Sequence, residues 1–260
     1  MLFVSSSNVV VFIPAGGEGR RFRPLTYYIP KPMVPLGKSE RPVLEFIILW
    51  VSRWGLRDFI VSVGYKWRQV VNYFGDGSRF NVNMKYVVDR PPYSNTGGGL
   101  VRALDLGLLD GYEDVLVWYG DIVTPLNVES LLNYHTSGSD ATLVLASTYK
   151  VPVGVAEVEG ESVVRLEEKP TLNIRATVGI LVFKVSSLEK AVREFGLGFD
   201  FDIMGDLIPA MIREGMRVKP YIYDGLWHDI GSIERYEKVD HEVLEKLLNI
   251  EDTNPGYVFL

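Results

Sequence analysis

Short apolar runs, rich in β-branched residues, alternate with longer amphipathic segments through the first half of the chain. The runs that predict strands cover residues 9–13, 59–63, 84–88 and 115–119. The segments between them that predict helices cover residues 43–54, 67–74 and 100–109. Pro42 near the first turn and Gly55 just past the end mark the first long helix. Such alternation predicts an α/β class protein whose parallel strands are joined by helical crossovers.

The pattern changes after about residue 140, where strands follow one another with few helices between them. The runs that predict strands cover residues 141–148, 153–158, 162–166, 177–184 and 217–223. Glu159-Gly160-Glu161 is typical of a hairpin turn. A helix over 203–214, which Gly215 stops, and a last helix over about 233–248 complete the chain. With no internal repeat and no low-complexity linker, residues 1–260 are interpreted as one α/β unit whose second half extends the sheet with antiparallel strands.

Composition excludes several classes of protein. The chain has 260 residues, of which 47% are hydrophobic, enough for a sizeable core. It has no run of roughly 18 to 20 apolar residues, as a membrane span requires. The start, MLFVSSSN, lacks the cationic and apolar segments of a signal peptide, so a cytoplasmic protein without a membrane partner is expected.

Residue types also limit the available chemistry. Without cysteine, disulfides, thiolate catalysis and cysteine zinc sites are excluded, and three histidines leave little for a histidine metal site. Any metal is therefore expected on carboxylates. The net charge of −6 argues against a nucleic-acid partner, because proteins that bind nucleic acid usually carry a basic face.

Cations gather in the segment that follows the first predicted strand, PAGGEGRRFRPLTYYIPKPMVP, residues 14–35. Gly16, Gly17 and Gly19 allow backbone N–H groups to approach an anion without obstruction by a Cβ atom. The spacing matches neither the P-loop nor the dinucleotide fingerprint. The prolines of the segment predict an extended loop rather than a helix. Arg21 and Lys31 on this loop suit a triphosphate, whose charge must be neutralised before a nucleophile can approach.

A second glycine cluster, Asn95-Thr96-Gly97-Gly98-Gly99, precedes the helix predicted from Leu100. A loose surface turn would explain it equally well. At the end of the third strand, however, it would lie on the same carboxyl edge of the sheet as the first loop, where ligands of open α/β sheets bind. Two glycine loops on one crevice could hold a planar base between them.

Two carboxylates are candidates for a metal site. Asp121 follows the apolar run 115–119, so its carboxylate should emerge at the same edge, where such groups hold Mg²⁺ against substrate phosphates. The alternative is an Asp that begins a turn. Asp229 lies among apolar neighbours and therefore needs a cation, or else it caps the last helix. The run Glu167-Glu168-Lys169-Pro170 by itself indicates only solvated charge.

Together these motifs resemble the sugar-1-phosphate nucleotidylyltransferases, which make an NDP-sugar and pyrophosphate from an NTP and a sugar 1-phosphate. The family signature A-G-G-x-G-T-R-L-x-P-L-T, followed by P-K-P-M-x-P, corresponds to residues 15–26 and 30–35. Further matches occur in family order over residues 8–245: Phe74-Gly75-Asp76-Gly77-Ser78, Thr96-Gly97-Gly98, Gly120-Asp121, Glu168-Lys169-Pro170, Val178-Gly179-Ile180 and Trp227-His228-Asp229-Ile230-Gly231. The resemblance implies a three-layer, Rossmann-like α/β fold with a mixed, mostly parallel sheet and antiparallel additions in its second half.

The resemblance also implies roles for individual residues. Arg21 would neutralise the β- and γ-phosphates, Lys31 would steady the α-phosphate, and Asp121 and Asp229 would share Mg²⁺. The nucleotide would be held by Ala15, Gly16, Gly17, Glu18, Gly19, Thr96, Gly97 and Gly98. The sugar phosphate would be held by Gly154, Glu168, Lys169 and Gly179. Residues 8–140 would be the nucleotide-binding half, 141–245 the sugar-phosphate-binding half and 246–260 a tail.

The motifs do not determine the base of the NTP or the sugar of the sugar 1-phosphate, because different motifs favour different members of the family. The second glycine cluster lies between guanylyl and cytidylyl patterns, and Tyr119-Gly120-Asp121 resembles the cytidylyl type. The segment 227–231 favours guanylyl and thymidylyl types, whereas Lys31-Pro32 argues against the bacterial thymidylyl type. Mannose-1-phosphate guanylyltransferase is the first hypothesis. The alternatives are thymidylyl, cytidylyl and uridylyl transfer to glucose 1-phosphate, and a noncatalytic subunit that binds NDP-sugars.

Two features have no assigned role. Arg20 stands where the family usually has Thr or Ser, which adds a cation near the phosphates or the entrance. The apolar tail 257–260 could dock on its own chain or on a neighbour, so a homo-oligomer is left open.

Overall fold

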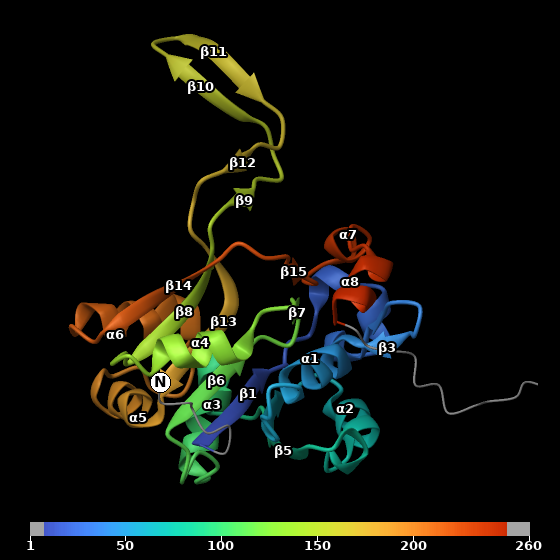
Figure 1. Ribbon diagram of the computed structural model, residues 1–260, viewed down its shortest axis with the longest axis vertical. Helices are drawn as coiled ribbons and strands as arrows, with labels where there is room; N and C mark the ends of the chain where they lie inside the picture. The colour runs from blue at the N-terminus through green and yellow to red at the C-terminus, as the bar shows by residue number, and fades with distance from the viewer. Residues whose placement is uncertain (1–7, 249–260) are drawn as a thin grey trace, which may run out of the picture.

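A seven-stranded sheet forms the centre of the molecule, and the computed structural model describes residues 8–248 of the chain (Figure 1). Its strands, in spatial order, are β14 (Val218–Tyr223), β8 (Ala141–Ala146), β13 (Ala176–Lys184), β6 (Asp114–Trp118), β1 (Val9–Pro14), β4 (Asp58–Val63) and β5 (Asn83–Val88). β1 pairs in parallel with β4 and β6, β4 with β5, and β8 with β14. β13 runs antiparallel to both β6 and β8. The sheet is therefore mixed and mostly parallel, as predicted.

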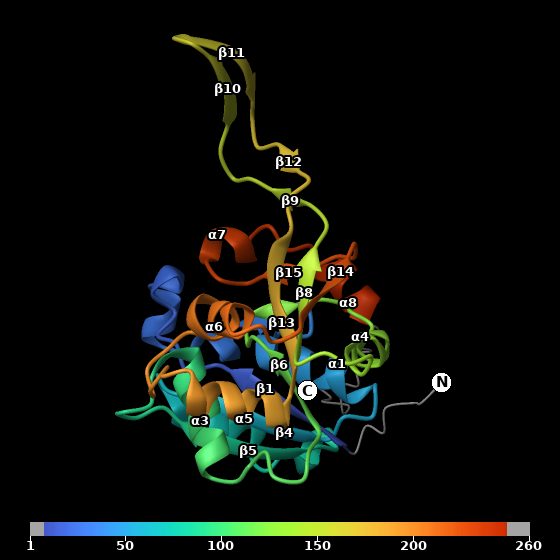
Figure 2. The same cartoon turned by 90° about the vertical axis from the view of Figure 1, so that its left-hand side faces the viewer.

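Helices cover both faces of this sheet (Figures 1 and 2). The α-helices of the described residues are α1 (Val43–Ser52), α2 (Trp67–Phe74), α3 (Asn95–Asp105), α4 (Val128–His135), α5 (Val185–Glu194), α6 (Ile208–Arg213), α7 (Ile233–Tyr236) and α8 (His241–Leu248). Of these, α7 and α8 lie beside the first loop and the segment after it, where Tyr236 donates a hydrogen bond to the carbonyl oxygen of Pro35 at 2.6 Å (Figure 1). Because side chains alternate along a strand, β1 contributes to two cores. Val11 and Ile13 join the cluster that contains α1, whereas Phe12 joins the cluster that contains Leu100 of α3 and Leu188 of α5. This arrangement confirms the three-layer α/β fold.

Several helix boundaries differ from the predictions. α3 begins at Asn95 rather than Leu100, so the second glycine cluster lies inside its first turns instead of in a preceding loop. The predicted last helix is two helices, because Asp240 interrupts it and accepts a hydrogen bond from the amide of Val243 at 3.0 Å. The helix predicted over 203–214 begins with a π-helical turn, Ile203–Leu207.

Helices α4 and α5 were not predicted. Asn127 caps α4 by accepting a hydrogen bond from the amide of Ser130 at 2.8 Å. Within residues 8–248 no helix combines the length and the apolar character that a membrane crossing needs. The apolar tail 257–260 and most of the predicted 246–260 segment lie outside the described residues.

The cationic first loop is more compact than predicted. It contains three 3₁₀ turns, Arg20–Phe22, Leu25–Tyr27 and Lys31–Met33, where an extended chain was expected. Proline is disfavoured in the interior of an α-helix, but it fits these short turns because few backbone N–H donors are needed there. Phe22 is completely buried and anchors the first turn in the core.

Residues 147–175 leave the sheet between β8 and β13 and form a projecting arm (Figures 1 and 2). Its stem pairs β9 (Tyr149–Lys150) with β12 (Thr171–Leu172), and its end is a hairpin of β10 (Val155–Glu159) and β11 (Ser162–Glu167). The hairpin was predicted, but it does not extend the central sheet. Of the strands in the second half, β8, β13 and β14 join that sheet, and only β13 is antiparallel to its neighbours there.

Two further pairs of short strands support the loops at one edge of the sheet. β2 (Pro35–Leu36) pairs with β3 (Arg41–Pro42) after the first loop. β7 (Ile122–Val123) pairs with β15 (His228–Asp229), which joins two segments far apart in sequence. In this way the chain between β14 and α7 lies directly beside the end of β6.

Candidate active site

Two adjoining cavities open at the carboxyl edge of the central sheet. The smaller, of about 310 Å³, is lined by the first loop and by the end of β6. The larger, of about 850 Å³, is lined by the end of β6, the root of the arm and the segment around β15. Arg21, Tyr119 and Asp121 line both cavities. The two cavities are therefore parts of one crevice that meet at these three residues.

The first loop forms one wall of the smaller cavity. Ala15, Gly17, Gly19 and Lys31 are among the lining residues, whereas Gly16 and Glu18 are not. Gly16 instead allows the loop to pass close to the ends of β4 and β5, because a Cβ atom there would overlap the Asp89 carboxylate and lie 3.2 Å from the amide nitrogen of Gly64. Gly17 faces open space, with no atom within 4 Å of an added Cβ atom. Its backbone is thus accessible to a ligand, which fits the predicted cradle.

The cations of this loop have different surroundings. Glu18 accepts hydrogen bonds from Arg20 Nε at 2.7 Å and from Arg23 Nη2 at 3.3 Å, all on exposed side chains. Within residues 8–248 no carboxylate forms an ion pair with Arg21. Arg20, which had no assigned role, also lines the smaller cavity. The guanidinium of Arg21 is therefore available to an anionic ligand.

Lys31 forms an ion pair with Asp121 at the junction of the cavities. Both side chains are about four-fifths buried, with 18% and 22% of their surfaces exposed. Such a pair is screened less by solvent than a surface pair. Lys31 thus lies beside the predicted metal ligand as well as on the wall of the smaller cavity.

Asp121 and Asp229 lie next to each other because β7 pairs with β15. Asp229 is opposite Ile122 in this pairing, and the amide of Ile230 donates a hydrogen bond to the carbonyl oxygen of Asp121 at 2.8 Å. Gly231 allows the side chains of Asp229 and Arg21 to lie close to its backbone, because a Cβ atom on Gly231 would lie 2.5 Å from Asp229 Oδ1 and 3.3 Å from Arg21 Nη2. Side chains from three segments therefore converge.

Asp229 also has an unsatisfied oxygen. Its Oδ2 atom forms an ion pair with Arg235 of α7, whereas its buried Oδ1 atom has no hydrogen-bond partner in the described part of the chain. A buried carboxylate oxygen without a partner is costly, and a cation would remove this cost. No group of three or more His, Asp or Glu residues in the described chain is arranged to hold a metal ion. Two carboxylates are enough for Mg²⁺ when substrate phosphates and water complete its coordination.

The larger cavity has a cationic rim. Lys150 of β9, Arg235 of α7 and Lys238 line it together with Arg21. Gly179 of β13 also lines it, with φ of +82°, a conformation that favours glycine. The carbonyl oxygen of Gly179 accepts a hydrogen bond from the amide of Tyr119 at 3.0 Å, which fixes both residues at the junction. The rim suits a second anionic ligand.

Three predicted residues of the sugar-phosphate site lie on the arm, outside the lining of either cavity. Lys169 Nζ lies 3.6 Å from Glu168 Oε1, and both side chains are mostly exposed. A Cβ atom on Gly154 would lie 3.0 Å from Glu168 Oε2. The three residues are thus neighbours of one another at the start of the hairpin, but this structure does not bring them into the crevice.

The second glycine cluster has a packing role in this structure. Thr96 lines the smaller cavity, donates a hydrogen bond to Asp202 Oδ2 at 2.8 Å and accepts one from the amide of Ile203 at 2.9 Å. A Cβ atom on Gly97 would overlap the ring of Phe201, and one on Gly98 would lie 2.5 Å from the carbonyl oxygen of Phe199. These two glycines therefore allow α3 to approach the segment before the π-helical turn.

Sequence reasoning missed Tyr119 and Arg235. Tyr119 lines both cavities, and burial raises the pKa of its phenol well above its ordinary value. Its place directly before Gly120-Asp121 at a strand end was the available signal. Arg235 pairs with Asp229 only because α7 follows β15 closely in space, and the sequence carries no pattern for that contact.

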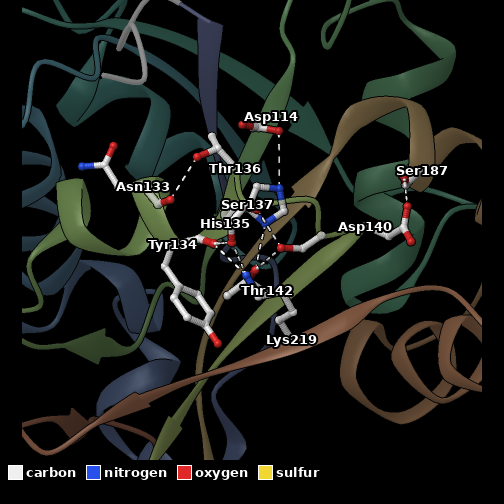
Figure 3. Close-up of polar contacts among 11 residues, drawn as sticks. Asp114, Asn133, Tyr134, His135, Thr136, Ser137, Asp140, Thr142, Ser187 and Lys219 are labelled. Carbon is white, nitrogen blue, oxygen red and sulfur yellow. Dashed lines mark hydrogen bonds and ion pairs between the residues drawn. The ribbon is translucent and has the colours of Figure 1, made fainter. Parts of the chain in front are cut away.

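A second polar cluster, at the amino edge of the sheet, has the residue types of a hydrolytic triad (Figure 3). His135 Nδ1 lies 2.9 Å from Thr142 Oγ1, and His135 Nε2 lies 3.4 Å from Asp114 Oδ1. His135 and Thr142 are 1% and 0% exposed, so no substrate can reach them. Ser139 completes the cluster by donating to the carbonyl oxygen of His135 at 2.7 Å. The cluster joins α4 to the starts of β6 and β8 and is structural.

Comparisons with known proteins agree with the geometry of the crevice. The model of the nucleotidyl transferase family matches residues 10–246. Glucose-1-phosphate adenylyltransferase of Clostridium botulinum is 29% identical over 274 residues, which cover 96% of this chain and 70% of that protein. UTP–glucose-1-phosphate uridylyltransferase of Synechocystis is 28% identical over 255 residues, which cover 90% of this chain and 63% of that protein.

Solved structures show the same fold. The crystal structure of a putative glucose-1-phosphate thymidylyltransferase from Bacillus anthracis superposes with a TM-score of 0.70 at 20% identity, covering 95% of this chain and 97% of that one. The structure of HddC from Yersinia pseudotuberculosis gives a TM-score of 0.67 at 21% identity, covering 90% and 99%. Because the family model spans most of the chain and the curated relatives share one reaction type, the chain belongs to the nucleotidyl transferase family, as one of its sugar-1-phosphate nucleotidylyltransferases.

Proposed function

We propose that this enzyme binds an NTP in the smaller cavity and a sugar 1-phosphate in the larger one. The observation that carries the proposal is the shared lining of the two cavities, Arg21, Tyr119 and Asp121. A ligand in each cavity would meet the other at this junction. Two anionic substrates there need positioning and neutralisation of charge, which a cationic rim and a free guanidinium supply.

In the proposed reaction an oxygen of the sugar phosphate attacks the α-phosphorus of the NTP in line. A bond forms between this oxygen and the α-phosphorus, and the bond from the α-phosphorus to the bridging oxygen of the β-phosphate breaks. The electron pair leaves with pyrophosphate. The attacking oxygen is already anionic, so no strong general base is required. Arg21 stabilises the charge on pyrophosphate, and Lys31 steadies the α-phosphate.

Asp121 and Asp229 are the proposed ligands of Mg²⁺. When bound, the ion would neutralise phosphate charge and hold the phosphate oxygens in place. The unpartnered Oδ1 atom of Asp229 supports this assignment. In this structure Lys31 and Arg235 neutralise the two carboxylates. Binding of Mg²⁺ would therefore release these cations toward the phosphates.

Gly154, Glu168, Lys169 and Gly179 remain the proposed sugar-phosphate residues. The pKa of Glu234 in α7 is lowered mainly by its hydrogen bond and ion pair with Lys238, and also by the charge of Lys169. Lys169 is thus close enough to α7, which forms the rim of the larger cavity, to affect its charges. The arm stem would have to move to bring Lys169 and Glu168 over a sugar phosphate in the larger cavity, because neither residue lines that cavity in this structure.

Guanylyl transfer to mannose 1-phosphate is the first specific hypothesis, on the motifs at residues 95–99 and 227–231. The second candidate is adenylyl or uridylyl transfer to glucose 1-phosphate. It is favoured by the names of the curated relatives, which include glucose-1-phosphate adenylyltransferases and a uridylyltransferase. The two hypotheses differ in both substrates, so one matrix of reactions separates them.

The test is to incubate the full chain with each NTP, Mg²⁺ and a panel of hexose 1-phosphates while pyrophosphate release and NDP-sugar formation are measured. We expect pyrophosphate only when both substrates are present, with the highest kcat/KM for GTP and mannose 1-phosphate. A higher value for ATP or UTP with glucose 1-phosphate would select the second candidate. If no pair releases pyrophosphate, the proposed function is wrong.

A further inference from the structure

The hairpin at the end of the arm has one apolar and one charged face. Residues paired across two strands share a face of the ribbon. The pairs Ala156–Leu166 and Val158–Val163 form the apolar face, whereas Glu157–Arg165 and Glu159–Ser162 form the other. On the charged face Arg165 forms ion pairs with Glu157 at 3.3 Å and with Glu167 at 3.0 Å.

Within residues 8–248 nothing covers the apolar face. Leu166 is 70% exposed, Val163 65% and Val158 63%. The hairpin stands clear of the helices and of the central sheet in both views (Figures 1 and 2). A two-stranded hairpin alone is marginally stable in water, and a sheet normally buries its apolar face against another element. The face therefore requires a cover.

Contacts within the stem join its two strands, and one ring contact joins the stem to the body of the protein. β9 pairs with β12, and Arg175 Nη1 donates a hydrogen bond to the carbonyl oxygen of Ser147 at 2.9 Å. The amide of Val151 donates a hydrogen bond to the carbonyl oxygen of Pro170 at 3.0 Å. The ring of Tyr149 stacks on Trp227, with 6.5 Å between the ring centroids. To fold the hairpin back over its own body, the stem would have to give up the stacking of Tyr149 on Trp227.

The two parts of the arm carry opposite charges. The hairpin, residues 155–167, has four glutamates and one arginine, a net charge of −3. The stem, residues 147–154 and 168–175, has Lys150, Lys169 and Arg175 against Glu168, a net charge of +2. The stem also exposes two apolar side chains, Val153 at 58% and Ile174 at 46%. Hairpin and stem are thus complementary in charge, and both present apolar surface.

We propose that the arm, residues 147–175, is a dimerisation element that lies antiparallel along the arm of a second copy of this chain. A two-fold axis between the copies places the acidic hairpin of each on the cationic stem of the other. The apolar faces of both hairpins are then covered in the same way. Leu166, Val158 and Val163 then bury their apolar surface against the partner's stem. The number of residues in the arm is comparable with the roughly 20 to 30 per partner in a standard interface.

Sedimentation velocity of the full chain at micromolar concentration tests the proposal. We expect a dimer, and we expect the double variant Val163→Glu with Leu166→Glu to raise the dimer Kd at least tenfold. Both side chains are largely exposed, so the fold should persist, as circular dichroism will show. The matched control is Ile212→Glu on α6, a side chain 58% exposed far from the arm in sequence. A monomeric parent chain, or a dimer unchanged by the double variant, would overturn the proposal.

The antiparallel arrangement has a separate test, because the chain contains no cysteine. Chains with Val158→Cys and chains with Ile174→Cys are mixed under oxidising conditions, and cross-linked pairs are measured by non-reducing electrophoresis. We expect a 158–174 disulfide between copies, and none when Ile212→Cys replaces Ile174→Cys. Cross-linking of Val158→Cys only to itself would place hairpin on hairpin and contradict the antiparallel arrangement.

Discussion

The carboxyl and amino edges of the central sheet carry polar clusters of similar residue types in different surroundings. At the carboxyl edge, Asp121, Asp229 and Arg21 line cavities, and one oxygen of Asp229 has no partner. At the amino edge, His135 and Asp114 are buried, and Thr142 and Ser139 complete a network closed to solvent. The comparison shows that access to solvent, rather than residue type, distinguishes the candidate reactive cluster from the structural one, since the buried Nε2 atom of His135 also has no hydrogen-bond partner among the described residues.

The largest expected effect is that of Arg21→Ala on turnover. Loss of a cation that stabilises the charge of the leaving group should lower kcat about 100- to 1000-fold. Thermal unfolding should be unchanged, because Arg21 is exposed and forms no ion pair in the described chain. Arg23→Ala is the matched control, since Arg23 lies in the same loop but lines neither cavity. Near-normal turnover of the Arg21 variant would refute the assignment of Arg21 as the residue that stabilises the leaving group.

A smaller effect is expected for Asp229→Asn. The variant should raise the Mg²⁺ concentration for half-maximal activity at least about tenfold, because an amide is a weaker ligand than a carboxylate for a hard cation. A Mg²⁺ titration of pyrophosphate release measures it. Asp224→Asn, on an exposed residue before the same segment, is the control. A titration identical to that of the parent would exclude Asp229 as a metal ligand.

At the amino edge, His135→Ala should change stability rather than activity. It leaves the Asp114 carboxylate and the Thr142 hydroxyl buried without this partner and opens a cavity. Together these should lower the free energy of unfolding by about 2 to 3 kcal/mol. Urea denaturation measures the loss, while kcat/KM below the transition should match that of the parent. If the variant lost activity but kept the stability of the parent, the structural role of the cluster at the amino edge would be wrong.

The smallest effect contrasts two glycines near the carboxyl edge. Gly97→Ala should lower the free energy of unfolding by about 1 to 3 kcal/mol, because its methyl group overlaps the Phe201 ring. Gly17→Ala has open space and should leave stability unchanged. If the Gly17 backbone cradles phosphate, this variant should raise KM for the NTP instead. Equal stability of the two variants would contradict the packing role of Gly97.

Much of the fold followed from local pattern. The apolar runs at residues 9–13 and 59–63 are strands of the central sheet, and such runs are continuous because helices bury both faces of these strands. The helix predicted over 67–74 is α2, whose buried residues Val70 and Phe74 lie about one turn apart. The start of α3 could not be predicted in this way. Three consecutive glycines disfavour a helix, and contacts with Phe199 and Phe201 override that propensity.

The candidate site was predictable to the extent that strand ends determine it. Asp121 follows β6 directly, and the glycines follow β1, so both had to emerge at the carboxyl edge. The pairing of β15 with β7, which places Asp229 beside Asp121, joins segments about 100 residues apart and has no local signal. The ion pair between Arg235 and Asp229 joins residues only six apart, but it depends on how the chain turns between β15 and α7, for which the sequence carries no pattern.

The sequence by itself determined the class of the fold, the glycine-rich cationic loop and the charged groups at the ends of β1 and β6. These depend on backbone periodicity and on residues adjacent in the chain. Only the tertiary structure decided that Arg21 and Asp121 lie at the junction of two cavities, that His135 is closed to solvent, and that the hairpin stands apart with an apolar face that none of residues 8–248 covers. The physical reason is that each of these depends on long-range packing, which determines what surrounds a side chain and cannot be deduced from its neighbours in sequence.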